Sequence, residues 1–174
     1  RRTRLPAIHS TACCLPNAWR FFAALPEYVC SWDDDGVWVN LYSSATVTHE
    51  LASGTRVAFR METLYPHDGR VEITVEGEAP TTWSLRLRIP DWCHAATVTD
   101  PEGRLSEHDG GASATLARTW QPGDRVVLDM PMPVRAVESA PEVAANAGQV
   151  AIARGPLVYC LEQADATVPI ERLA

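Results

Sequence analysis

Apolar and polar residues alternate with a period of two along several short segments, and this pattern limits the fold more than any other feature of the sequence. Two-residue alternation is typical of strands that bury one face and expose the other. No helical period lies between these segments, so the pattern predicts a mainly β fold built as an antiparallel β-sandwich. The inward positions of four predicted strands are Val37, Val39 and Leu41; Val57, Phe59 and Met61; Val71, Ile73 and Val75; and Leu85, Leu87 and Ile89.

Turn-forming sequences separate the predicted strands, and aromatic residues fall on both faces. Trp83 and Trp120 occupy inward positions, where we expect them to pack in the core. Trp38, Asn40 and Tyr42 alternate with the inward positions of their strand, so we expect a contact surface on its outer face. The turn sequences are Ala52–Gly54, His67–Gly69, Asp100–Gly103, Asp109–Gly111 and Pro122–Asp124.

A helical pattern precedes the predicted strands. Aromatic residues and alanines can share one face of a helix between Trp19 and Leu25, and Pro26 ends that run. Pro16 suits the first turn of a helix, where its missing N–H would have no partner in any case. The sequence therefore predicts one substantial helix, near residues 16–25.

Two adjacent cysteines, Cys13 and Cys14, directly precede this predicted helix. Unpaired N–H groups and the positive end of the helix dipole favour an anionic thiolate there. A thiolate is the form of cysteine that attacks carbon and binds metal ions. Two other interpretations stay open: burial of the thiols as small apolar groups, and a strained vicinal disulfide. One such pair supplies at most half of a tetrahedral zinc site.

The pattern divides the chain into three unequal parts. Residues 1–30 are expected to form the end of a preceding helical domain, and residues 31–134 the β-sandwich. Residues 135–174 are expected to begin a second β unit, because Pro131–Pro133 marks a boundary after the last sandwich strand. The sequence opens on Arg1 with neither Met nor a signal-peptide pattern, so we expect it to be an excerpt of a longer protein.

Composition excludes several classes of partner. The formal net charge is −7, which argues against nucleic-acid binding. No apolar run has the length needed to span a bilayer, so no membrane association is expected. The 5 cysteines are odd in number and scattered, unlike a disulfide framework. A reducing compartment or a metal-held pair fits them better, and a cytoplasmic location is expected.

A series of short motifs, taken in order, resembles the C-terminal part of the β-L-arabinofuranosidase family, glycoside hydrolase family 127. The resemblance runs from the double cysteine to about Glu162, and Leu15 departs from it at a position where the family more often has Pro. The motifs are Cys13–Arg20, Ala24–Val29, Ser31–Tyr42, Tyr65–Pro66, Leu85–Trp92, Trp120–Asp124 and Gly155–Tyr159.

The resemblance implies an (α/α)6-barrel catalytic domain followed by two β-sandwiches, of which this chain would hold the last barrel loop and helix, one sandwich and the start of the second. It implies a retaining glycoside hydrolase in which Cys13 is the nucleophile and both Cys13 and Cys14 bind zinc. The other zinc ligands and the acid/base would precede Arg1, so the chain alone is expected to be inactive. The implied substrate is a carbohydrate, a terminal arabinofuranoside of a plant-type glycan. The implied partner is the missing N-terminal barrel, and a homodimer is one expected assembly.

Other candidate residues have less support in the sequence. The acidic run Asp33–Asp35 could supply a pair of catalytic carboxylates, although such a cluster before a strand is normally a solvated turn. His9 lies four residues before Cys13 and could reach the same site. A second function class also stays open, a non-catalytic accessory or carbohydrate-binding sandwich. A module of that kind has no evident need for Cys13 and Cys14.

Overall fold

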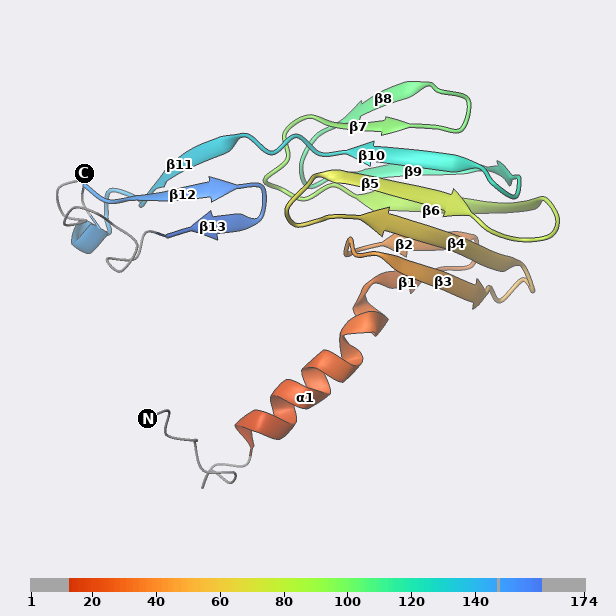
Figure 1. The fold of residues 1–174 in the computed structure, drawn as a ribbon, viewed down its shortest axis with the longest axis horizontal. Helices are drawn as coiled ribbons and strands as arrows, with labels where there is room; N and C mark the ends of the chain where they lie inside the picture. The colour runs from red at the N-terminus through yellow and green to blue at the C-terminus, as the bar shows by residue number, and fades with distance from the viewer. Residues whose placement is uncertain (1–12, 147, 161–174) are drawn as a thin grey trace, which may run out of the picture.

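The computed structural model describes residues 13–146 and 148–160, which form one helix, two short 3₁₀ helices and thirteen strands (Figure 1). The chain runs through helix α1 and the 3₁₀ helix η1 into the strands. The elements are α1 Cys14–Ala24, η1 Leu25–Tyr28, β1 Cys30–Trp32, β2 Gly36–Val39, β3 Ala45–Glu50, β4 Arg56–Thr63, β5 Arg70–Val75, β6 Thr81–Arg88, β7 Ala96–Thr99, β8 Leu105–His108, β9 Ser113–Trp120, β10 Arg125–Asp129, β11 Val134–Glu138, η2 Ala144–Asn146, β12 Val150–Arg154 and β13 Leu157–Tyr159.

Ten of these strands form two sheets that pack face to face. One sheet has the order β1-β2-β6-β9 and the other the order β3-β4-β5-β10-β7-β8. Every described pair in them is antiparallel except β2 with β6, which run parallel. The prediction of a mainly antiparallel β-sandwich is confirmed, and the described part of residues 37–130 contains no helix.

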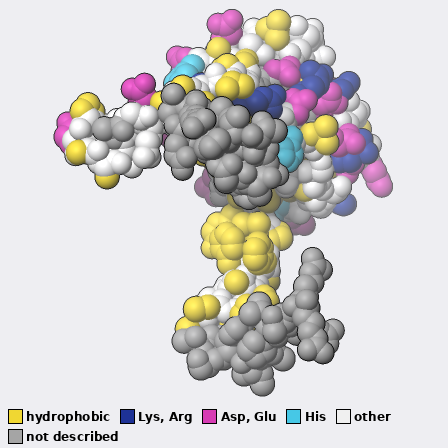
Figure 2. Space-filling view, turned by 60° about the vertical axis from the view of Figure 1, so that its left-hand side comes forward, with side chains coloured by type: hydrophobic (Ala, Val, Ile, Leu, Met, Phe, Trp, Pro, Cys, Tyr) yellow, Lys and Arg dark blue, Asp and Glu magenta, His cyan; other side chains and the backbone are white. Residues whose placement is uncertain are grey.

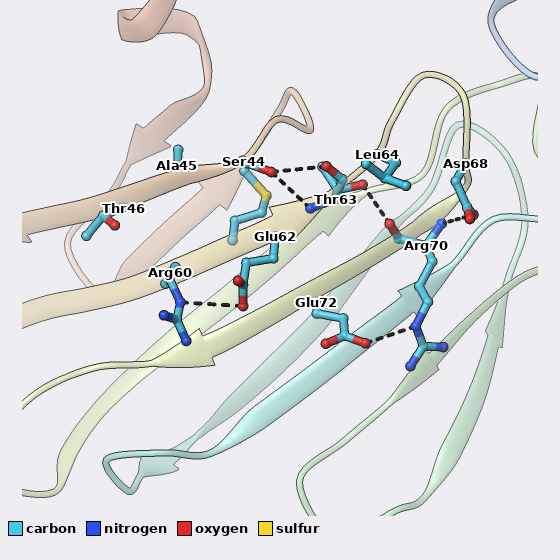
Figure 3. Close-up of a pocket in the computed structure, with 11 residues that line it drawn as sticks. Ser44, Ala45, Thr46, Arg60, Glu62, Thr63, Leu64, Asp68, Arg70 and Glu72 are labelled. Atoms are coloured by element: carbon cyan, nitrogen blue, oxygen red, sulfur yellow. Dashed lines mark hydrogen bonds and ion pairs between the residues drawn. The ribbon is translucent and has the colours of Figure 1, made fainter.

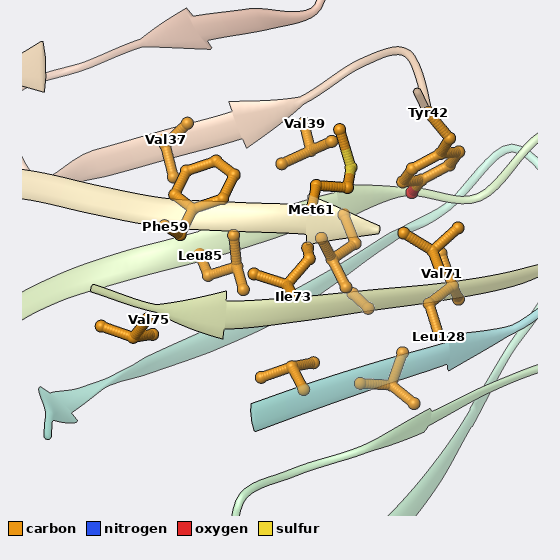
Figure 4. Packing of buried hydrophobic residues seen from close by; sticks show 14 of the residues in the cluster. Val37, Val39, Tyr42, Phe59, Met61, Val71, Ile73, Val75, Leu85 and Leu128 are labelled. Atoms are coloured by element: carbon orange, nitrogen blue, oxygen red, sulfur yellow. The ribbon is translucent and has the colours of Figure 1, made fainter. Parts of the chain in front are cut away.

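The core lies between the two sheets and is made by the inward positions of the alternating pattern (Figure 4). Val37, Phe59 and Leu85 are fully buried. Trp83 and Trp120 stack with ring centroids 5.0 Å apart, and the indole N–H of Trp120 donates to the Trp83 carbonyl oxygen at 2.9 Å. The expected core positions of these two tryptophans are therefore confirmed.

The alternation fails after Asn40, where the sequence predicted Leu41 inside and Tyr42 outside. Strand β2 ends at Val39, and the backbone N–H groups of Asn40 and Leu41 both donate to the carbonyl oxygen of Val29. The resulting bend leaves Leu41 exposed and turns Tyr42 into the core, where its hydroxyl donates to the Arg88 carbonyl oxygen at 2.6 Å. The expected outer surface of Trp38, Asn40 and Tyr42 therefore does not exist as a unit.

The parallel pairing of β2 with β6 depends on Gly36. A Cβ atom at this position would lie 2.0 Å from the carbonyl oxygen of Ser84, the residue that faces Gly36 in β6. We expect Gly36→Ala to lower the free energy of unfolding by at least about 2 kcal/mol, because either the strand pair or the carbonyl must move. Denaturant unfolding of the two proteins would measure the loss.

Gly54→Ala is the matched control. Gly54 has φ +79°, and a Cβ atom added there would have no neighbour within 4 Å. The substitution should therefore lower the free energy of unfolding only by the cost of a left-handed backbone, about 1–2 kcal/mol. A Gly36→Ala protein as stable as the control would contradict the steric argument.

The remaining described strands form a separate three-stranded sheet of order β11-β12-β13. It lies beyond one end of the sandwich (Figure 1) and is joined to it by Arg154, whose guanidinium donates to the His67 carbonyl oxygen at 2.8 Å. Val134, Val158 and Tyr159 of this sheet are exposed. The sheet agrees with the prediction of a further β unit after Pro133, while the division at residues 31–134 stays a prediction.

Candidate active site

The double cysteine lies at the N-terminal end of α1. The helix begins at Cys14, two residues before the predicted start, so only Cys13 precedes it and the expectation that both thiols do so is wrong for Cys14. Both residues are exposed and neither forms a disulfide. Their sulfur atoms lie 3.8 Å apart on adjacent residues.

This separation fits a shared metal ion. Two thiolates bound to one tetrahedral zinc ion at about 2.3 Å each lie about 3.8 Å apart. The first turn of α1 has no acidic side chain, and no side chain caps it. No carboxylate of the helix therefore competes with the two sulfurs at its N-terminal end.

The rest of a metal site is not found among residues 13–146 and 148–160. No group of three or more His, Cys, Asp or Glu side chains in that part of the chain could hold a metal ion. His9 lies outside the described residues. Two of the described histidines have other partners: His49 stacks on Trp32 with ring centroids 4.0 Å apart, and His108 hydrogen-bonds the hydroxyl of Ser106.

The acidic run beside β2 binds one arginine. Arg86 contacts Asp33 at 2.8 Å and Asp35 at 2.7 Å, and its guanidinium carbon lies 5.0 Å from the ring centroid of Trp38. We call Asp33, Asp35, Arg86 and Trp38 the aspartate clamp. It joins the β1–β2 loop to β6. The three aspartates are exposed in that loop, as expected of a solvated turn, and two of them are also partners of Arg86.

The aspartate clamp makes Asp33 unusually acidic. The Trp38 indole N–H donates to Asp33 at 2.9 Å, and this hydrogen bond, together with that from the Asp35 N–H and the charge of Arg86, lowers the pKa of Asp33 from 3.8 to about 2. Because the pKa of Asp33 is lower in the folded state, its ionised carboxylate contributes its full stabilisation at pH values above 3.8. That contribution is lost as the pH falls through about 2.

We therefore expect Trp38→Phe to raise the pKa of Asp33 toward 3.8, so that the ionised carboxylate stabilises the fold less at neutral pH and less of that stability is lost on acidification. The carboxyl ¹³C resonance of Asp33, followed by NMR during acid titration, measures the shift. Trp92→Phe is the control, since Trp92 lies outside the clamp. An unchanged titration in Trp38→Phe would mean that the indole does not hold the carboxylate.

Helix α1 projects from the sandwich and exposes its large apolar side chains. Figure 2 shows the apolar column of α1 below the sandwich. Trp19, Phe21 and Phe22 are exposed by 69%, 57% and 67%, and no residue of the helix is buried. A surface of this kind ordinarily marks a contact with other protein.

The comparisons with known proteins assign the family. Residues 36–132 match the family described as "Beta-L-arabinofuranosidase, GH127 middle domain", and residues 134–174 match "Glycoside hydrolase family 127 C-terminal domain". The chain belongs to glycoside hydrolase family 127. The family resemblance seen in the sequence is thereby confirmed.

Several known proteins are similar to this chain over most of its length. The non-reducing end β-L-arabinofuranosidase of Bifidobacterium longum subsp. longum is 36% identical over 162 residues, which are 88% of this chain and 24% of that protein. The crystal structure of a GH127 β-L-arabinofuranosidase from Geobacillus stearothermophilus T6 is 41% identical with a TM-score of 0.80, over 91% of this chain and 25% of that one. A structure described as a glycoside hydrolase is 34% identical with a TM-score of 0.83, over 96% and 29%.

The chain thus spans about a quarter of the length of these family 127 relatives. None of the described helices is long and apolar enough to cross a membrane.

Sequence reasoning missed the aspartate clamp, because in the alternating pattern Arg86 is only an outward-facing position of a predicted strand. The run of three aspartates indicated a cationic partner, but it did not identify which arginine would contact them.

Proposed function

We propose that this chain is part of a retaining glycoside hydrolase that releases terminal arabinofuranosyl residues, with Cys13 as its nucleophile. The observation that carries the proposal is the 3.8 Å separation of the Cys13 and Cys14 sulfurs at the start of a helix, in a chain of family 127. The relatives named as β-L-arabinofuranosidases supply the substrate class.

Cys13 would act through its sulfur. The thiolate attacks the anomeric carbon, a C–S bond forms, and the glycosidic C–O bond breaks as a carboxylic acid protonates the departing oxygen. That carboxylate then takes a proton from water, whose oxygen attacks the same carbon while the sulfur leaves again as thiolate. Two inversions at one carbon give net retention. The acid/base is expected from a segment before residue 1.

Cys13 and Cys14 would hold a zinc ion in this proposal, completed by a Glu and a Cys from a preceding segment. A zinc ion bound there would keep the sulfurs deprotonated near neutral pH and moderate their nucleophilicity. Cys14 would then have a positioning role, because it fixes the direction of the neighbouring thiolate.

The test uses the complete protein that carries this chain. Hydrolysis of p-nitrophenyl β-L-arabinofuranoside, bound zinc by elemental analysis, and the anomer first formed by ¹H NMR are measured together. We expect turnover, stoichiometric zinc and the β-anomer as first product, with no turnover by residues 1–174 alone. Inversion, or full activity after complete removal of zinc, would overturn the proposed chemistry.

A further inference from the structure

A polar groove lies at the end of the sandwich where the β3–β4 turn meets the other sheet. In Figure 1 this end is remote both from the β11–β13 sheet and from the free end of α1. The groove has a volume of about 560 Å³, within the range of small-molecule sites. Its wall is formed by Asp34 and Asp35 of the β1–β2 loop, Leu51, Ser53 and Thr55 of the β3–β4 turn, Thr82, Trp83 and Ser84 of β6, and Ala117, Arg118 and Thr119 of β9.

Hydroxyl groups in this groove are joined in pairs. Ser53 lies 3.0 Å from Thr55, and Thr82 lies 2.7 Å from Thr119 across the β6–β9 ladder. A hydroxyl that accepts one such bond still has its own hydrogen to donate and a lone pair to accept with. The pairs therefore present both donors and acceptors, and Asp34 adds a carboxylate without a hydrogen-bond partner among the described residues.

Two wall residues of the groove have buried N–H groups without partners. These are Trp83 Nε1 and Arg118 Nε, the two such side-chain atoms found in the part of the chain that the structure describes. Trp83 is 2% exposed, and an unpaired buried donor costs about 1–3 kcal/mol. Both unpaired donors thus belong to residues that line one groove.

Another hollow of the described surface has no such buried donor among its lining residues. It lies over β3, β4 and β5, has a volume of about 580 Å³, and is shown in Figure 3. Its charges are satisfied within the chain: Arg60 pairs with Glu62 at 3.5 Å and Arg70 with Glu72 at 3.0 Å. These ion pairs leave neither arginine in need of a bound ligand as a partner.

The chemistry of the groove selects the class of ligand. An anion would meet the carboxylates of Asp34 and Asp35, while Arg118 is already paired with Glu102. A metal ion would need a third ligand, and the described residues offer no such cluster. An apolar ligand would leave the exposed hydroxyls without partners. A neutral ligand with several hydroxyls, each both donor and acceptor, matches these hydroxyls and the Asp34 carboxylate.

We propose that this groove binds a neutral saccharide unit. The groove residues are distant in sequence from Cys13, and the proposal does not depend on whether Cys13 is catalytic. The hydroxyl pairs and Asp34 bind the edge of the sugar, while Leu51 and Trp83, which are 4% and 2% exposed, lie in the wall beneath it. Weak binding, with Kd on the order of 1 mM, is expected of an open site with a few hydrogen bonds.

The test uses the complete protein labelled with 5-fluorotryptophan, whose ¹⁹F resonances are followed as L-arabinose is added. Trp83→Phe removes one resonance and so assigns Trp83. We expect that resonance to shift saturably with L-arabinose and to stay unchanged with sodium sulfate. A Trp83 signal that does not move, that moves only linearly together with the other tryptophans, or that responds to sulfate instead would overturn the proposal.

A matched pair of variants on β9 tests the groove without touching the core. Thr119→Val removes a hydroxyl that lines it, whereas Thr115→Val removes an exposed hydroxyl from the same strand outside it. We expect calorimetric titration with L-arabinose to show a loss of about threefold to tenfold in affinity for Thr119→Val and none for Thr115→Val. Equal affinities in the two variants would overturn the proposed position of the sugar.

Discussion

Replacing Cys13 by Ser in the complete enzyme is expected to lower kcat by several orders of magnitude. The substitution keeps a small polar side chain, but an alkoxide forms far less readily than a thiolate, so the covalent step has no competent nucleophile. No sugar should become attached at position 13. Steady-state turnover measures the first effect, and intact mass after reaction with an arabinofuranose-based, thiol-reactive inhibitor, followed by peptide mapping, measures the second.

Cys14→Ser is the matched control, because it alters the neighbouring sulfur, 3.8 Å away, and should change the enzyme differently in kind. We expect weaker zinc retention, reduced activity through a misplaced Cys13, and partial recovery at high zinc concentration. The covalent label should still map to Cys13. A label on any other residue, or near-normal turnover in Cys13→Ser, would end the cysteine-nucleophile hypothesis.

Residues 1–174 alone are expected to associate in solution at micromolar concentration. Trp19, Phe21 and Phe22 are mostly exposed along α1, and burying one such side chain contributes about 1.5–3 kcal/mol. Exposed apolar surface of this extent favours association. The exposed side chains of β13, the last strand of its sheet among the described residues, add a second apolar surface. Size-exclusion chromatography with light scattering should therefore show species larger than the monomer.

The double variant Trp19→Glu, Phe22→Glu should shift the chain toward the monomer. The control is Leu64→Glu, Leu105→Glu, which introduces the same charge at two side chains that are 75% and 72% exposed but lie outside α1. Only the α1 variant should reduce association. A wild-type chain that is a monodisperse monomer with cooperative melting would contradict the idea that α1 lacks a partner.

Most of the sandwich could be predicted from alternation, because the period of a strand determines which side chains face the core. The same period does not determine which strands are neighbours, so the parallel pairing of Gly36 with Ser84 was not predictable. Alternation also failed at Tyr42, where a bend and a hydrogen bond to Arg88 decided the orientation.

The candidate site was predictable only in part. Adjacent cysteines before a helical pattern indicated Cys13 and Cys14, but the sulfur separation that fits a shared ion depends on the backbone at the helix start. The partner of Asp33 and Asp35 was hidden, because Arg86 is distant in sequence and close only once β2 lies beside β6. Pairings of that kind come from topology, which local patterns do not encode.

The parallel contact between β2 and β6 has a consequence for the order of folding. During synthesis β2 leaves the ribosome long before β6, and its antiparallel neighbour β1 offers only three residue pairs. The β3–β4–β5 meander can form from local turns in the meantime, whereas β1 and β2 must wait for a non-local partner. The segment that joins α1 to the sandwich is thus fixed later than this meander, once β6 has been made. A nascent chain stalled before residue 81 would present α1 on an unpaired tether, the species on which a chaperone would be expected to act.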